Sequence, residues 1–194
     1  KTLRDRLEKE GTIFQTTTDS EMILHLIAKS KKEDLISQII DALNQVKGAY
    51  SLVMLTEGKL LGIRDPHGVR PLALAKLENS YYIASETCAF DIIGAEYIRD
   101  IEPGEIVVID DETVKTGEIK SYRLKEEVEQ YHHCIFEYIY FSRPDSFIFG
   151  ESVDKVRRKL GKSLAEEKPV YHVGDEKIMV MSVPDSSNTA AIGY

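Results

Sequence analysis

The chain changes character over a run of fifteen residues: His132-His133-Cys134-Ile135-Phe136-Glu137-Tyr138-Ile139-Tyr140-Phe141-Ser142-Arg143-Pro144-Asp145-Ser146. This run holds two histidines, one cysteine, one glutamate and four aromatic residues. Before it, the sequence consists of short β-type segments separated by turns. After it comes a long amphipathic helical pattern, followed by an apolar segment and a polar loop. We therefore interpret residues 134–150 as a junction between two domains.

Composition narrows the class of protein. The 194 residues are 42% hydrophobic and 30% charged, which is typical of a chain that buries a core. The net charge of −8, with basic residues interspersed among acidic ones, argues against a nucleic-acid partner. We see no apolar run of the roughly 20 residues that span a bilayer and no signal peptide, so we expect a cytoplasmic protein without a membrane partner. Because the chain starts at Lys1 and stops just inside a helical pattern, we expect an internal segment of a longer protein.

Residues 1–133 predict an α+β fold, because strands come in runs and helices in pairs. Expected helices cover residues 1–10, 33–46 and 87–93, and another helix starts at Thr18 with a capping box that pairs Thr18 with Glu21. Residues 12–17 read as a strand. Four further β segments predict an antiparallel meander, and a strand pair completes the unit. These segments are 49–55, 59–64, 72–77, 81–85, 105–110 and 118–122.

Residues 151–194 follow a different pattern. Residues 151–167 predict a helix with apolar residues on one face. Residues 178–183 are apolar without alternation, which is typical of a strand covered on both faces in a parallel sheet. The polar turn at residues 184–191 then opens a helix, and a strand followed by a helix N-terminus can bind an anion.

Several motifs occur in one order along the chain and together resemble the amidophosphoribosyltransferases. Asp-Pro-His-Gly at 65–68 and Ser-Glu-Thr at 85–87 are general to class II glutamine amidotransferases. Residues 136–146 and Pro184-Asp185-Ser186-Ser187 narrow the likeness to the phosphoribosyl branch. The remaining matching segments are Thr17–Glu21, Gly48–Val53, Arg64–Leu72, Ser85–Phe90 and Glu102–Glu105.

The resemblance implies a fold and an activity. Residues 1–133 would be the later part of an N-terminal-nucleophile glutaminase, an α/β/β/α sandwich. Residues 134–150 would be the junction, and 151–194 the start of an α/β type I phosphoribosyltransferase domain. The parent enzyme would make 5-phosphoribosylamine from phosphoribosyl pyrophosphate and glutamine, the first committed step of de novo purine biosynthesis. It would be a homo-oligomer, with purine nucleotides as feedback inhibitors.

The nucleophilic cysteine of the family would lie upstream of Lys1, so we expect this segment to be inactive alone. The alternative is a catalytically dead glutaminase-like scaffold or regulatory domain. A relative such as a glutamine:sugar-phosphate aminotransferase should not carry the Tyr-Phe-Ser-Arg-Pro-Asp-Ser junction.

The resemblance also implies roles for single residues. Asp19 would hold the α-ammonium group of glutamine; the alternative is a plain negative charge at a helix N-terminus. We read residues 64–71 as a shaped turn in which Arg and Asp pair with each other. Ser85, Glu86 and Thr87 read as strand-end and helix-cap residues.

Cofactor candidates are few. Cys134 would be one of four thiolate ligands of a [4Fe–4S] cluster, and its alternative is a buried thiol; Cys88 receives no function. The two adjacent histidines should point apart, so we expect no zinc site. Ser186 would lie near Mg²⁺ and Ser187 near phosphoribosyl pyrophosphate, the alternative being an ordinary helix cap. An Arg143–Asp145 pair would fix the interdomain angle and line the ammonia path.

Overall fold

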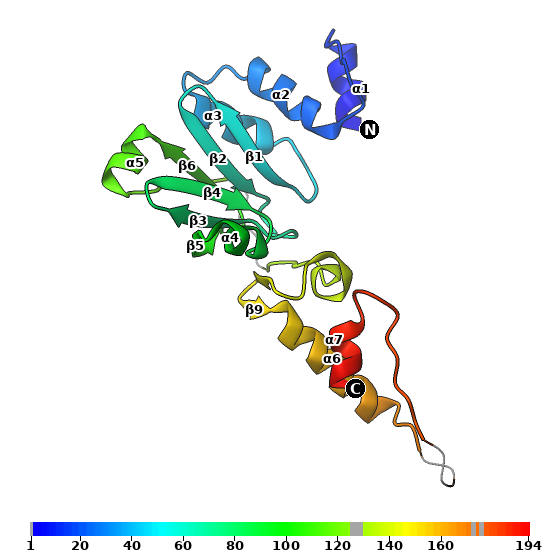
Figure 1. Cartoon of the computed structure of the whole chain (residues 1–194). Helices are drawn as coiled ribbons and strands as arrows, with labels where there is room; N and C mark the ends of the chain where they lie inside the picture. Colours follow the sequence, from blue (N-terminus) through cyan, green and yellow to red (C-terminus); the bar gives the residue numbers. More distant parts are fainter. Residues whose placement is uncertain (1, 125–129, 172–173, 175–176) are drawn as a thin grey trace.

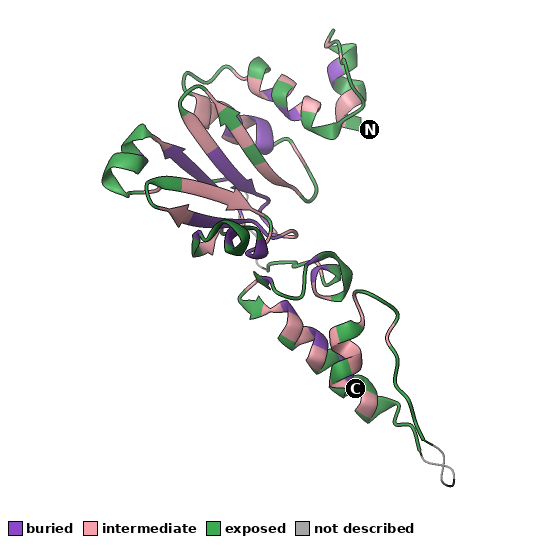
Figure 2. Cartoon of the chain, in the orientation of Figure 1, coloured by how far each residue is buried: buried purple, intermediate pink, exposed green. Residues whose placement is uncertain are grey.

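The computed structural model describes residues 2–124, 130–171, 174 and 177–194. Figure 1 shows a body of two β-sheets with helices on the outside, from which a helical arm extends toward the C-terminus. The buried residues concentrate in the sheets, whereas the arm is mostly half-buried or exposed (Figure 2). No helix in the described ranges is long and apolar enough to cross a membrane.

The body contains two antiparallel sheets. The first has the order β1-β2-β6-β7, with β1 at Ser51–Thr56, β2 at Lys59–Arg64, β6 at Glu105–Asp110 and β7 at Lys120–Arg123. The second has the order β4-β3-β5, with β3 at Ala73–Leu77, β4 at Ser80–Ala84 and β5 at Glu96–Asp100. The predicted hairpins β1–β2 and β3–β4 and the pair β6–β7 are confirmed.

The predicted meander is wrong at its centre, because β2 pairs with β6 and not with β3. After Arg64 the turn at residues 65–71 carries the chain into the second sheet. The strand β5, which the sequence analysis did not predict, pairs with β3 there. The helix α5, Asp111–Thr116, was also not predicted; it lies between β6 and β7.

Alternating side chains join the layers, because successive residues of a strand point to opposite faces. Ile106 and Val108 of β6 pack with the helices α2 and α3, whereas Val107 and Ile109 pack with residues of the second sheet. The far face of that sheet packs Ala73 and Ala75 against Phe90 of α4, Cys88–Ile93. The layers are therefore helix, sheet, sheet, helix, as the sequence analysis expected for the glutaminase part (Figure 1).

A glycine permits the close approach of the two sheets. A Cβ added at Gly62 of β2 would lie 2.5 Å from Cδ1 of Ile101 and 2.9 Å from Cδ1 of Ile83. Such distances are below van der Waals contact, so a side chain at this position would force the ends of these two isoleucine side chains to move.

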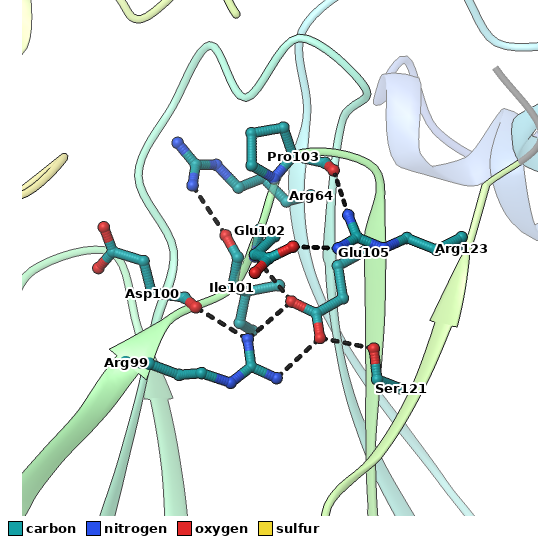
Figure 3. A network of polar contacts seen from close by, with 9 residues as sticks. All are labelled: Arg64, Arg99, Asp100, Ile101, Glu102, Pro103, Glu105, Ser121 and Arg123. Atoms are coloured by element: carbon teal, nitrogen blue, oxygen red, sulfur yellow. Dashed lines mark hydrogen bonds and ion pairs between the residues drawn. The ribbon is translucent and has the colours of Figure 1, made fainter. Parts of the chain in front are cut away.

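A network of polar contacts links β5 of the second sheet with β6 and β7 of the first sheet (Figure 3). The buried carboxylate of Glu105 accepts two hydrogen bonds of 2.7 Å from the guanidinium of Arg99. It also accepts one from the hydroxyl of Ser121 at 2.6 Å and one from the amide of Glu102 at 2.7 Å. Because Arg99 belongs to β5 and Glu105 to β6, this carboxylate ties one sheet to the other.

The N-terminal helices are α1 (Thr2–Lys9), α2 (Asp19–Lys29) and α3 (Leu35–Leu43). The strand predicted at residues 12–17 is wrong, because this segment forms a loop. The predicted capping box is also wrong. Thr18 makes no side-chain cap, and the Glu21 carboxylate accepts the amides of Gln15 at 2.7 Å and Thr16 at 2.8 Å. Glu21 therefore stabilises the loop before α2 and accepts no hydrogen bond from the amide of the N-cap residue, Thr18.

The arm begins after the sandwich. It contains a π-helical segment, Glu137–Phe141, the short strands β8 (Phe147–Ile148) and β9 (Glu151–Ser152), and the helices α6 (Val153–Glu167) and α7 (Asn188–Gly193). The helix predicted at 151–167 is confirmed from Val153 onward. The strand predicted at 178–183 is wrong: this extended segment pairs with no strand in the described part of the chain, and Met179, Met181 and Val183 are exposed.

Helices α6 and α7 pack through their backbones. A Cβ at Gly161 would lie 1.9 Å from the carbonyl oxygen of Ala190, and one at Gly193 would lie 2.2 Å from that of Arg158. Two glycines on facing helices thus allow a contact that no larger residue could make.

Candidate functional site

A cavity lies where α1, α2 and the end of α3 meet the start of β1. Its volume is about 640 Å³, within the range of small-molecule sites. Polar and apolar side chains share its wall. They include Arg6, Asp19, Gln45, Met22, Ile23 and Leu52.

Asp19 is the first residue of α2 and reaches this cavity from the helix N-terminus. Among the described residues its carboxylate has no hydrogen-bond or ion-pair partner. The loop before it is held by Glu21, whose pKa falls to about 2 because it accepts hydrogen bonds, first from the Gln15 amide and then from the Thr16 hydroxyl. The arrangement leaves one unpaired anionic side chain on the wall of a cavity, where it can bind a cationic group.

A second cavity of about 480 Å³ lies next to the first, and Ala49 and Tyr50 line both. Its other walls come from the sandwich and from the π-helical segment. They include Arg70, Ser85, Glu86, Glu137 and Phe141.

The turn after β2 is structural, as expected, but its internal pairing differs from the prediction. The buried Arg64 donates to the carbonyl oxygens of Gly68, Arg70 and Ile101 at 2.8–2.9 Å. The buried carboxylate of Asp65 accepts the amides of His67 at 3.0 Å and Val69 at 3.1 Å. The two side chains therefore do not pair with each other; each satisfies backbone groups that the tight turn leaves without partners.

Two residues read as local caps make long-range contacts instead. A Glu86 carboxylate oxygen accepts the amide of Arg143 at 2.7 Å and the hydroxyl of Ser146 at 2.9 Å. The Thr87 hydroxyl accepts the amide of Phe147 at 2.8 Å and caps no helix by its side chain. The buried Glu137 was not predicted to be a functional residue. In the sequence it stands out only as an acidic residue within a run of aromatic residues.

The Arg143–Asp145 pair exists. The guanidinium donates to both carboxylate oxygens at 2.8 and 3.0 Å, and it is this contact that raises the pKa of Arg143 and lowers that of Asp145. Both side chains are more than half exposed, so the pair contributes little stability. It is the backbone amide of Arg143, not the guanidinium, that binds the sandwich.

The cysteine and histidines of the junction lie apart from the first cavity. The Cys134 amide donates to the carbonyl of Val69, and its thiol is half-buried. His132 lies against His67, and His133 stacks on Phe149 at 4.0 Å, so the adjacent histidines do have separate neighbours. Burial, and then the nearby Arg64 charge, lower the pKa of His133.

These junction residues offer few ligands for a metal ion or cluster. The described residues contain no cluster of three or more His, Cys, Asp or Glu side chains that could hold an ion. A [4Fe–4S] cluster needs four thiolates, and Cys134 offers one. The donors described here therefore do not by themselves fit a cluster.

Ser186 and Ser187 lie in the turn before α7 and are half-buried. The Ser187 hydroxyl donates to the carbonyl of Val183 and provides no side-chain cap to the helix. The alternative of an ordinary helix cap is therefore wrong for the Ser187 side chain.

A family model described as a glutamine amidotransferase domain matches residues 1–91. The chain is 45% identical over 192 residues to amidophosphoribosyltransferase of Bacillus subtilis, covering 99% of this chain and 38% of that protein. It is 47% identical over 195 residues to the chloroplastic amidophosphoribosyltransferase 1 of Arabidopsis thaliana, covering 100% of this chain and 32% of that protein.

A solved structure agrees. Glutamine phosphoribosylpyrophosphate amidotransferase from B. subtilis, complexed with ADP and GMP, superposes with a TM-score of 0.90 at 45% identity, over 100% of this chain and 40% of that one. The mixed helix–sheet body is therefore that of a glutamine amidotransferase domain. More particularly, the chain is similar along its whole length to amidophosphoribosyltransferases, and it spans well under half the length of these relatives.

Proposed function

We propose that this chain supplies the glutamine-binding part of an amidophosphoribosyltransferase and leads into its phosphoribosyltransferase domain. The complete enzyme would release ammonia from glutamine and use it to displace pyrophosphate from phosphoribosyl pyrophosphate, giving 5-phosphoribosylamine for purine biosynthesis. The observation that carries the proposal is the Asp19 carboxylate, which has no partner among the described residues and lies on the wall of the 640 Å³ cavity, within the part of the chain that matches a glutamine amidotransferase domain.

Asp19 would bind the α-ammonium group of glutamine. A carboxylate that faces an ammonium group makes a charge-assisted hydrogen bond, which selects a free amino acid over a peptide-bound residue. Neither described cysteine, Cys88 nor Cys134, lines the cavity. The nucleophile that attacks the side-chain amide would therefore come from outside this chain, and we expect the chain alone to be inactive.

The domain division follows the same proposal. Residues 1–133 would form the glutaminase part, 134–150 the junction and 151–194 the first piece of an α/β phosphoribosyltransferase domain. The packing supports this division, because the described sandwich strands end at Arg123 and α6 packs closely on α7, away from the sheets.

Other roles remain part of the proposal. Ser187 would contact phosphoribosyl pyrophosphate and Ser186 the Mg²⁺ shell, while Arg143 and Asp145 would hold the interdomain angle beside the ammonia path. Cys134 would ligate a [4Fe–4S] cluster only if three further thiolates came from outside this chain. Purine nucleotides would act as feedback inhibitors of a cytoplasmic homo-oligomer; the relative solved with ADP and GMP is consistent with nucleotide control.

The test is Asp19→Asn in a full-length enzyme that carries this chain. Loss of one charged hydrogen bond, about 1.5–3 kcal/mol, predicts a roughly 10- to 150-fold higher KM for glutamine, with ammonia-dependent amine formation unchanged. Asp34→Asn is the matched control, because Asp34 caps α3 through the Ser37 amide and does not line the cavity. An unchanged KM combined with a lower melting temperature would show that Asp19 serves only its helix.

A further inference from the structure

The carboxylate of Glu137 lies at the meeting point of the sandwich and the arm. The residue is 2% exposed and opens the π-helical segment Glu137–Phe141. Its Oε1 lies 2.7 Å from Nε of Arg70, and its Oε2 accepts the hydroxyl of Ser142 at 2.6 Å. The amide of Ser142 donates to the Glu137 carbonyl, so this turn is closed by side chain and backbone alike.

On one side, Glu137 is tied to the sandwich. The carbonyl of Arg70 accepts the Nε–H of Arg64 at 2.9 Å and the hydroxyl of Ser51 at 3.2 Å, which fixes Arg70 to the ends of β1 and β2. The Arg70 guanidinium also lies 4.4 Å from the centre of the Phe141 ring. Arg70 thus contacts both the first residue of the π-helical segment, Glu137, and the last, Phe141.

On the other side, the segment is tied to α6. Arg157 of α6 is 2% exposed, and its guanidinium donates to the carbonyl of Tyr138 at 2.5 Å and to that of Ser142 at 2.7 Å. Burial lowers the pKa of this guanidinium, which the charge of Glu86 partly offsets. A buried arginine that donates hydrogen bonds to two carbonyl groups holds the helix in one orientation. Any rotation of the helix would leave the buried guanidinium and the two carbonyl groups without partners.

These contacts form one continuous path from Arg70 through Glu137 and Ser142 to Arg157. π-Helical turns are rare and are frequently found at functional sites. Here the turn is held by charges that belong to different parts of the chain. It also lines the second cavity, beside the cavity that contains Asp19.

We propose that Glu137 is a positioning residue that fixes α6, and the segment that follows it, relative to the glutamine cavity. This inference rests on the proposed function, because the orientation matters only if ammonia made at one site is used at the other. Glu137 touches neither reactant in this scheme; it acts through Arg70 and Ser142. Its loss should impair the transfer of ammonia between the sites and spare each separate reaction.

The experiment is Glu137→Gln in the full-length enzyme, with three rates measured: glutamine hydrolysis, amine formation from glutamine and amine formation from added ammonia. Mutations that disturb coupling between sites change it by roughly 2- to 30-fold, so we expect the ratio of glutamine- to ammonia-dependent amine formation to fall within that range. Hydrolysis and the ammonia-dependent rate should stay near wild type. Ser142→Ala, which removes only the bond to Oε2, should lower the same ratio by less.

The matched control is Glu112→Gln, which removes an exposed carboxylate paired with Lys120 far from the junction and should leave the ratio unchanged. Equal losses in all three rates, or an unchanged ratio in Glu137→Gln, would overturn the proposal.

Amide hydrogen exchange separates this proposal from the proposed function. Glu137→Gln should speed exchange in residues 153–167 and leave β2 and β6 as protected as in wild type. Unchanged exchange in α6 would refute the positioning role even in an active enzyme. If the wild type neither hydrolysed glutamine nor used ammonia, the proposed function would fail, while the exchange result would still decide whether Glu137 holds α6.

Discussion

Replacing Glu105 by Gln tests the network that ties the two sheets together (Figure 3). The carboxylate is 2% exposed and all four hydrogen bonds that it accepts are short. The amide of glutamine must place an NH₂ group where one carboxylate oxygen was, and both positions face the guanidinium of Arg99. If the NH₂ group replaces Oε1, the Ser121 hydroxyl can rotate and accept a hydrogen bond from it. If the NH₂ group replaces Oε2, it faces the backbone amide of Glu102, which can only donate.

The magnitude follows from these contacts. At least one charged hydrogen bond is lost and two donors are brought face to face, which costs about 1.5–3 kcal/mol. Because the Arg99 side chain is 36% exposed, water can screen part of the loss, so we expect about 2 kcal/mol. Glu102→Gln is the control; it removes a carboxylate that pairs with Arg123 at the surface and should cost at most about 0.5 kcal/mol.

The pH dependence gives a second check. Burial raises the pKa of Glu105, but the hydrogen bonds from Arg99, Ser121 and Glu102 lower it by more, so its pKa in the folded protein lies below the ordinary value of 4.5. The stabilisation is therefore complete above about pH 4.5 and is lost as the pH falls through the folded-state pKa.

Urea unfolding of wild type and variant at pH 7 and at about pH 3 measures both effects, and the difference in the free energy of unfolding should shrink at the lower pH. A difference below about 0.5 kcal/mol at pH 7, or one that does not change with pH, would refute the reasoning.

Two further predictions concern packing. Ile39→Ala empties a fully buried position between α3 and the first sheet and should lower the free energy of unfolding by about 3 kcal/mol, whereas Leu55→Ala, at a site 83% exposed, should change it by less than about 0.5 kcal/mol in the same urea titration. Gly161→Ala should detach α7, because the added Cβ would lie 1.9 Å from the Ala190 carbonyl oxygen. Limited proteolysis should then cut residues 188–193 faster than in the control Lys162→Ala, which changes an exposed side chain of the same helix. Equal cleavage of the two variants would contradict the backbone packing of α6 on α7.

The local pattern of the sequence predicted much of the sandwich. The apolar spacing of α3 and α6 and the turn residues between β1 and β2 and between β3 and β4 act between near neighbours, so they could be read without the fold. The resemblance placed Asp19 at the glutamine site, and the structure places that residue on the wall of the 640 Å³ cavity; its role remains a proposal.

Only the tertiary structure decided which sheet each strand joins and how the junction is held. A strand forms by pairing with another strand, and the apolar residues 178–183 pair with none in the described part of the chain. Glu86 and Thr87 find partners 57 to 60 positions away, so no local pattern could distinguish them from helix caps. The same is true of Glu137, because burial of a carboxylate depends on a distant Arg70 that only the folded chain brings within 2.7 Å.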